Sequence, residues 1–408
     1  MRAPLFDLDD DELARAAWSR LAEPGDMNAG ALIAALGPSR ALHWLRAAHG
    51  DAQTVRQAID ALGERVPLLR AGQRALSAAV ARWGLRLTDL DPRREIQVLR
   101  SLGGALVTPG TACWPAGLDD LGAATPPCLW VRGDPGLSDA VSRSVALVGA
   151  RASTAYGNHV AGELAAGLAA RQVSVVSGGA YGIDAAAHRG ALLAGGTTVV
   201  LLAGGVDRAY PAGNAELLRT VVEHGGSVLS EVPPGGAPSR WRFLQRNRLI
   251  AGISRGTVVV EAAWRSGALS TANRAGELMR PVGAVPGPVT SMASAGCHRL
   301  LRDGAAVCVT DVDEVVELIG EIGRDLVPSR GSEDGPADGL GPEVRRVHDA
   351  LPVRTGAAPH LLAREVGLSE AEVRGALGTL ELLGIAARHG SGWRKASDRA
   401  PRHEDSDG

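Results

Sequence analysis

The stretch Val145-Ala146-Leu147-Val148-Gly149-Ala150-Arg151 decides the fold that this sequence predicts. Four apolar residues run directly into a glycine turn, which is typical of a strand buried in a parallel sheet. Similar short runs recur, with Ala- and Leu-rich helical segments between them, at residues 173–176, 198–202, 228–229, 258–260 and 282–285. Because strands that alternate with helices form parallel sheets, we expect an α/β fold with a doubly wound sheet.

The segments on either side of the sheet have other patterns. Residues 1–100 carry apolar residues at helical spacing and predict a helical N-terminal domain. The sheet domain is expected over residues 101–322, where a Pro- and Gly-rich connection at 101–142 precedes the first strand. Further along we expect a flexible linker, a winged-helix-like unit of three helices and two short strands, and a disordered tail, at residues 323–342, 343–394 and 395–408.

Glycine-rich turns follow four of the predicted strands. Ligands of open parallel sheets bind beyond the carboxyl ends of the strands, so these turns mark a candidate site. Gly149 and Arg151 follow the first strand, and Ser177 and Gly178 follow the second. Either Ser153 or Thr154 is expected to cap the next helix, whose free N–H groups would hold an anion.

The sequence offers no arrangement of residues for covalent catalysis. Asp184 is most simply a helix N-cap, and His188 lies one turn later and packs against it. We find no Ser-His-Asp order, no metal-ligand spacing and no convincing carboxylate pair, so no catalytic residue and no metal are expected. Neither a dinucleotide fingerprint nor a P-loop is present, which argues against NAD and ATP as cofactors.

The stretch from Arg240 to Arg248 is the most cationic part of a chain whose net charge is −2. No acidic residue lies between Glu231 and Glu261, whereas five arginines do, and Phe243 stands among them. Arginines beside an aromatic ring suit a backbone phosphate and a stacked base. The alternative is a solvated amphipathic helix with Phe243 in the core, and the pattern alone favours neither.

The cysteines and the apolar runs of the sequence indicate the cellular compartment. The four cysteines, Cys113, Cys128, Cys297 and Cys308, are scattered, and the chain shows no signal peptide, which is typical of a cytosolic protein. No apolar run approaches the length needed to span a membrane. A single lysine, Lys395, stands beside many arginines, so arginine content by itself says little about nucleic acid.

Taken together, these motifs resemble the bacterial DNA-processing protein A family, also called DprA or Smf. The resemblance covers residues 100–310 almost without a gap. It rests on the following motifs: Gly149-Ala150-Arg151, Ser177-Gly178-Gly179-Ala180, Gly182-Ile183-Asp184 with His188, Tyr210-Pro211, Ser230-Glu231, Phe243 with Arg246-Asn247-Arg248, Glu261-Ala262, Ser266-Gly267-Ala268-Leu269-Ser270-Thr271-Ala272 and Val285-Pro286-Gly287.

The resemblance implies an extended Rossmann-like domain that binds single-stranded DNA without sequence preference. The family protects incoming strands during natural transformation, loads a RecA-type strand-exchange recombinase onto them, acts as a homodimer and has no established catalytic activity. A helical N-terminal domain, of the SAM or helix-hairpin-helix kind, and a C-terminal winged helix are common additions. The DNA-binding residues that we expect in this chain are Gly149, Arg151, Ser177, Gly178, Arg240, Arg242, Phe243, Arg246, Asn247 and Arg248.

Roles can be assigned to most of these residues. Arg151, Arg246 and Arg248 would neutralise phosphates, Asn247 would hydrogen-bond a phosphate or a base edge, and Phe243 would stack on a base.

The family often has Gly-Ser-Arg at residues 149–151 and Phe-Pro at 243–244, where this chain has Gly-Ala-Arg and Phe-Leu. Because lysine is nearly absent, Arg240 or Arg242 must supply any lysine contact, with a change of geometry.

A second function on the same Rossmann variant is a nucleotide phosphoribohydrolase-like enzyme. That group uses a Gly-rich loop, an arginine and a glutamate, and Arg246 with Glu261 could mimic the charged pair. Its Pro-Gly-Gly-x-Gly-Thr loop is missing here, so we favour DNA binding.

Overall fold

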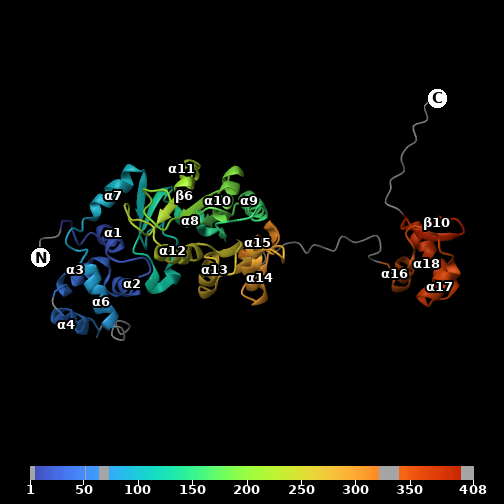
Figure 1. Cartoon of the computed structure of the whole chain (residues 1–408), viewed down its shortest axis with the longest axis horizontal. Helices are drawn as coiled ribbons and strands as arrows, with labels where there is room; N and C mark the ends of the chain where they lie inside the picture. Colours follow the sequence, from blue (N-terminus) through green and yellow to red (C-terminus); the bar gives the residue numbers. More distant parts are fainter. Residues whose placement is uncertain (1–4, 51, 64–72, 321–339, 397–408) are drawn as a thin grey trace, which may run out of the picture. The chain divides into compact units, whose positions relative to one another are not determined.

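The computed structural model describes residues 5–50, 52–63, 73–320 and 340–396 (Figure 1). It divides into two compact units, Met1–Leu326 and Val327–Gly408, which we describe separately. Most of the linker expected at 323–342, and the tail from residue 397, lie outside the described residues.

The larger unit is built on a nine-stranded sheet with the order β1-β2-β6-β5-β4-β3-β7-β8-β9. Pairing is parallel from β6 to β9, whereas β1 pairs with β2, and β2 with β6, in antiparallel fashion. The strands are β1 (Gly104–Val107), β2 (Leu129–Gly133), β3 (Ser144–Gly149), β4 (Ser174–Ser177), β5 (Thr198–Leu201), β6 (Ser227–Ser230), β7 (Gly256–Glu261), β8 (Val282–Ala284) and β9 (Val307–Cys308).

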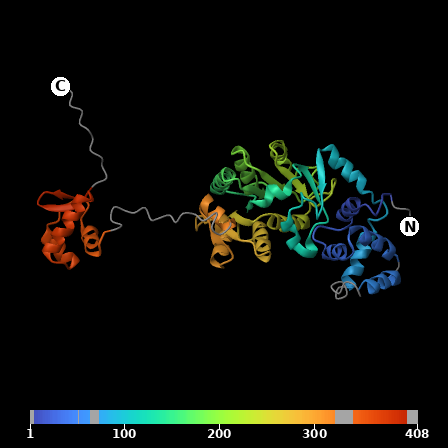
Figure 2. The ribbon, with the colours of Figure 1, turned by 180° about the vertical axis from the view of Figure 1, so that it is seen from behind.

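The sheet is covered on both faces, as a doubly wound fold requires. Along β3, Ala146 and Val148 face one apolar cluster, and Val145 and Leu147 face another. The first cluster includes α8 (Leu137–Ser142), α12 (Arg240–Ile253), α13 (Ala268–Glu277) and α14 (Ala295–Arg302). The second includes α9 (Ala155–Ala170), α10 (Ile183–Leu193) and α15 (Val312–Ile319), while α11 (Ala215–Glu223) packs near β5 and β6 (Figure 2).

Residues 101–142, the Pro- and Gly-rich connection, contain regular structure that we did not predict from the sequence. They contain β1, β2, α8 and the 3₁₀ segment η1 (Ala116–Ala124), and the two strands make one edge of the sheet antiparallel. Trp130 of β2 is fully buried, and its indole N–H donates to Ser19 in the N-terminal region at 3.2 Å. The edge therefore joins the helical region to the sheet.

The N-terminal region is helical, as the apolar spacing predicted. Its helices are α1 (Asp11–Leu21), α2 (Met27–Leu36), α3 (Pro38–Ala48), α4 (Ala52–Gly63), α6 (Gln73–Gly84) and α7 (Pro92–Ser101). Trp18 and Trp83 meet edge to face at the centre of their own core, with ring centroids 5.3 Å apart. Ala16 and the α7 residues Ile96 and Leu99 instead join a cluster on the sheet, so the helices pack against it.

The smaller unit has the element order expected from its sequence. Three helices, α16 (Pro342–Ala350), α17 (Pro359–Val366) and α18 (Glu370–Leu382), precede the antiparallel hairpin of β10 (Ala386–His389) and β11 (Gly392–Lys395). Ser369 and Glu372 form the capping box that starts α18. In the described residues of both units, no helix is long and apolar enough to cross a membrane.

Candidate nucleic-acid interface

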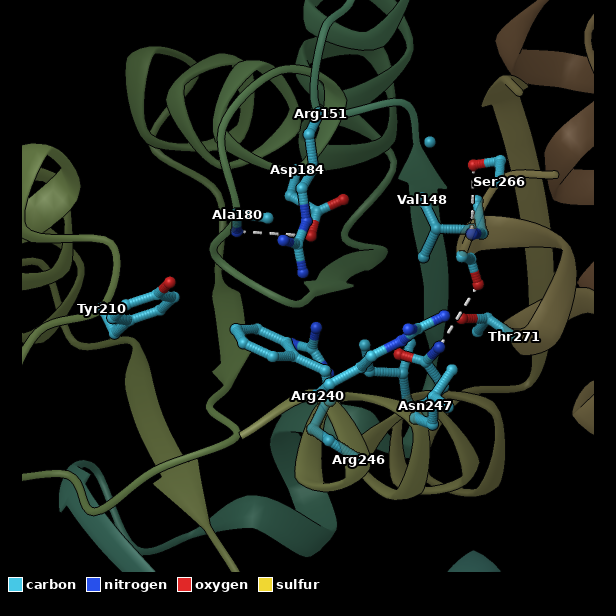
Figure 3. Close-up of a pocket in the computed structure, with 16 residues that line it drawn as sticks. Val148, Arg151, Ala180, Asp184, Tyr210, Arg240, Arg246, Asn247, Ser266 and Thr271 are labelled. Atoms are coloured by element: carbon cyan, nitrogen blue, oxygen red, sulfur yellow. Dashed lines mark hydrogen bonds between the residues drawn. The ribbon is translucent and has the colours of Figure 1, made fainter. Parts of the chain in front are cut away.

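A pocket of about 420 Å³ opens at the carboxyl end of β3 (Figure 3). From β3 the chain winds one way through β4, β5 and β6, and then returns to place β7 on the other side of β3. Ligands of doubly wound sheets bind at this point of reversal, where the loops diverge. The lining residues come from the β3 turn, α10, α12, α13 and the Tyr210 loop.

Phe243 of α12 lines this pocket and is partly exposed there. The Arg151 guanidinium carbon lies 4.6 Å from the ring centroid, and that of Arg246 lies at 5.8 Å. The Tyr210 ring, which is 47% exposed, lies 5.6 Å away and is tilted by 54°. The ring thus belongs to a cationic, aromatic wall of an open pocket, and the core alternative for Phe243 is not favoured.

Arg246 forms the floor of the pocket rather than its rim. Its side chain is buried, and Nη1 donates to the carbonyl of Gly178 at 2.8 Å and to that of Leu201. A Cβ atom on Gly178 would lie 2.0 Å from this nitrogen, so the glycine leaves room for the guanidinium. Burial lowers the pKa of Arg246 to about 10, which still leaves it charged at neutral pH. The buried Nε atom has no hydrogen-bond partner among the residues that the structure describes.

Asp184 faces the pocket from the first turn of α10. It is not the N-cap that we expected, because Gly182 holds that position, and its carboxylate instead accepts the Ala180 N–H at 3.3 Å. Burial raises the pKa of Asp184, although Arg246 opposes this shift. His188 is fully buried against Thr198, and burial lowers its pKa to about 3, so it is neutral and structural.

The N-terminus of α9, a candidate anion site, is occupied by the protein's own carboxylate. Thr154 caps the helix as predicted, accepting the N–H of Gly157 at 3.1 Å. Its own N–H and hydroxyl donate to buried Glu261, at 2.9 and 2.6 Å. Glu261 does not line the pocket, so it does not form the charged pair with Arg246 that the enzyme hypothesis needs.

Four of the ten expected DNA-binding residues do not line the pocket. The guanidinium of Arg248 donates to both carboxylate oxygens of Glu231, at 2.7 and 2.6 Å, and both side chains are at most 5% exposed. Arg242 pairs with Glu23 of the N-terminal region at 2.9 Å. Ser177 donates to the Leu147 carbonyl inside the sheet, and Gly178 accepts from Arg246.

The other six expected residues do share the pocket: Gly149, Arg151, Arg240, Phe243, Arg246 and Asn247. Asn247 donates to the Gly267 carbonyl at 3.3 Å and so joins α12 to the start of α13 (Figure 3). Our site prediction omitted Tyr210, Asp184 and Thr271. All three lie in or just after glycine-rich turns at strand ends, so their position at the same sheet edge was the available signal.

Two arginines of the pocket are free of protein acceptors. Among the described residues, neither Arg151 nor Arg240 has a hydrogen bond or an ion pair from its guanidinium, and both are exposed. Both side chains line the pocket and are labelled in Figure 3. They are therefore available to neutralise an anion, unlike Arg242 and Arg248. In the described part of the chain, no three His, Cys, Asp or Glu side chains are grouped to hold a metal ion.

Comparison with known proteins identifies the family of this chain. The family model for DNA recombination-mediator protein A matches residues 105–320. A DNA processing protein DprA from Mycobacterium tuberculosis is 43% identical over 397 residues, covering 94% of this chain and 95% of the relative. The protein Smf of Escherichia coli is 40% identical over 192 residues, which is 47% of this chain and 50% of that protein.

A solved structure of DNA processing protein A from Streptococcus pneumoniae superposes with a TM-score of 0.53. It is 32% identical to this chain and covers 68% of it, while this chain covers 96% of that structure. The shared fold and the near full-length relative establish the resemblance that the motifs suggested. This chain belongs to the DNA recombination-mediator protein A family, whose members are named DprA or Smf.

Proposed function

We propose that the pocket binds single-stranded DNA without sequence preference. The observation that carries this proposal is the Phe243 ring, which lines an open pocket with the free Arg151 guanidinium 4.6 Å from its centroid. An aromatic face accepts any base, and a cation beside it can meet the adjoining phosphate. Duplex DNA keeps its bases stacked inside the helix, so the ring favours single strands.

We assign the contacts with DNA from the exposure of the residues that line the pocket. Arg151 and Arg240 neutralise phosphates, Phe243 stacks on a base, and Asn247 and Gly149 lie close enough to the space to contact the backbone of the strand. Arg246 contributes positive electrostatic potential at the floor of the pocket, while its guanidinium donates a hydrogen bond to the Gly178 carbonyl. We do not include Ser177, Gly178, Arg242 or Arg248, because their polar groups are already used inside the protein.

We also propose the family's wider role for this chain, on the strength of the motifs that it shares. In that role the protein acts in the cytoplasm as a homodimer, protects incoming strands during transformation and passes them to a RecA-type recombinase. The C-terminal unit would serve as a winged helix. Winged helices usually bind duplex DNA, but α18 starts with the acidic Glu370 and Glu372, so a protein contact is an equal alternative.

Replacing Arg151 or Arg240 with alanine should weaken single-strand binding equally for all sequences. Each lost phosphate contact should reduce the slope of log affinity against log salt by about one. Fluorescence anisotropy with labelled oligonucleotides at several salt concentrations measures both quantities. Arg255→Ala is the matched control, because Arg255 is an exposed arginine just after α12 that lies outside the pocket. Equal losses in the control would refute the assignment, and equal affinity of the unaltered protein for duplex and single strand would refute the function.

The enzyme alternative predicts release of free base from nucleoside monophosphates. We expect none, because Glu261 is held by Thr154 and does not line the pocket with Arg246. Incubation with each monophosphate, followed by chromatography of the bases, tests this expectation. Release that Glu261→Gln abolishes would favour the enzyme.

A further inference from the structure

Trp264 stands in the turn between β7 and α13, next to the pocket. The Ser266 N–H donates to the Ala263 carbonyl at 3.1 Å, which closes a tight turn with Trp264 and Arg265 at its centre. Trp264 is 46% exposed, and Arg265 is exposed as well. Ser266 lines the pocket, and successive Cα atoms lie about 3.8 Å apart, so the Trp264 backbone is within about 8 Å of a pocket residue.

A cation is already positioned over this ring. The Arg299 guanidinium carbon of α14 lies 5.1 Å from the ring centroid of Trp264. The position of α14 is fixed, because the Gly296 N–H donates to the Ala262 carbonyl at 2.7 Å and a Cβ on Gly296 would clash with the same oxygen. The Trp264–Arg299 pair is therefore built into the fold, and the arrangement is the same ring-and-arginine combination as Phe243 with Arg151.

The charge around Trp264 also suits a polyanion. Between Glu261 and Asp303 the only acidic residue is Glu277, which pairs with Arg274. In the described part of the chain, the guanidiniums of Arg265 and Arg299 have no hydrogen bond and no ion pair, so both remain available for phosphate.

We propose that Trp264, Arg265 and Arg299 form a second contact site for single-stranded DNA, continuous with the pocket. The strand that stacks one base on Phe243 extends over the turn and stacks a further base on the free face of Trp264. Arg265 and Arg299 neutralise the phosphates between them. This inference rests on the proposed function. It implies that the bound strand contacts the protein beyond the pocket as well as inside it.

The test compares Trp264→Ala with the unaltered protein on a ladder of oligothymidylates. Long oligonucleotides should bind the variant about 5- to 150-fold more weakly, which corresponds to the ~1–3 kcal/mol of one stacked base. The shortest ones, which fill only the pocket, should bind both proteins alike. Trp264→Phe should restore much of the affinity. Trp241→Ala is the matched control, since Trp241 is 56% exposed and no arginine lies over its ring in the described residues.

Two readouts keep this inference separate from the function it builds on. If the unaltered protein binds no oligothymidylate, the proposed function fails. If it binds, and Trp264→Ala loses no more affinity than Trp241→Ala at any length, only the second site fails. A change of sedimentation with unchanged affinity would likewise overturn it, by making Trp264 a contact between copies of the chain. Quenching of tryptophan fluorescence by oligothymidylate should be smaller in Trp264→Phe, and an unchanged signal would contradict stacking.

Discussion

Arg248→Ala is expected to destabilise the larger unit by about 3–5 kcal/mol, the cost of breaking a buried ion pair from one side. The variant would leave the Glu231 carboxylate buried without its two guanidinium donors. It would also remove the hydrogen bond from Arg248 to the Ala124 carbonyl, which holds η1 to α12. Chemical denaturation followed by circular dichroism measures the change.

The same helix supplies the control. Arg240→Ala removes an exposed arginine and should change stability by no more than about 0.5 kcal/mol. Arg248→Lys should recover only part of the loss, because an ammonium cannot bind both carboxylate oxygens as a planar fork does. A stable Arg248→Ala protein with weakened DNA binding would instead make Arg248 a phosphate ligand, as the sequence suggested.

Phe243→Ala should cost about 1–3 kcal/mol of single-strand binding while leaving the fold nearly as stable. The ring is part of a pocket wall and contacts Arg151 and Tyr210 rather than filling the core. Phe243→Trp should keep much of the affinity, because it keeps a stacking face. Anisotropy and melting temperature should be measured on the same preparations.

The opposite pattern would identify Phe243 as a core residue. A buried phenylalanine loses about 3–5 kcal/mol of folding stability on replacement by alanine, because a cavity remains. If that loss occurred with binding intact in the folded fraction, only the arginines would support DNA binding. Tyr210→Ala is a useful companion, since it removes the neighbouring ring without touching α12.

Six strands of the sheet could be predicted because they are buried on both faces and read as continuous apolar runs. β1 and β2 were missed, since Gly104–Val107 and Leu129–Gly133 follow glycine or proline residues and neither strand is buried along its whole length. Strand β9 has only two residues, both exposed, and no pattern could identify it. The antiparallel edge therefore emerged only from the structure.

The site was predicted less completely, for a physical reason. Four arginines close together in sequence looked equivalent, yet a helix turns every 3.6 residues and points them in different directions. Their partners come from distant segments, such as Glu23 for Arg242 and Glu231 for Arg248. Local sequence shows the charges, but only the tertiary structure shows which of them are already neutralised.

The carboxylate of Glu261 at the start of α9 has a consequence for competition inside a cell. In dinucleotide-binding relatives of this architecture, the helix after the first strand receives the pyrophosphate. Here Glu261 accepts the N–H and hydroxyl of Thr154, and a Cβ on Gly157 would lie 2.3 Å from its oxygen, so that place is filled and negatively charged. We therefore expect that free nucleotides do not place their phosphates at the α9 N-terminus, so they would compete with DNA only at the Arg151 and Arg240 side chains of the pocket.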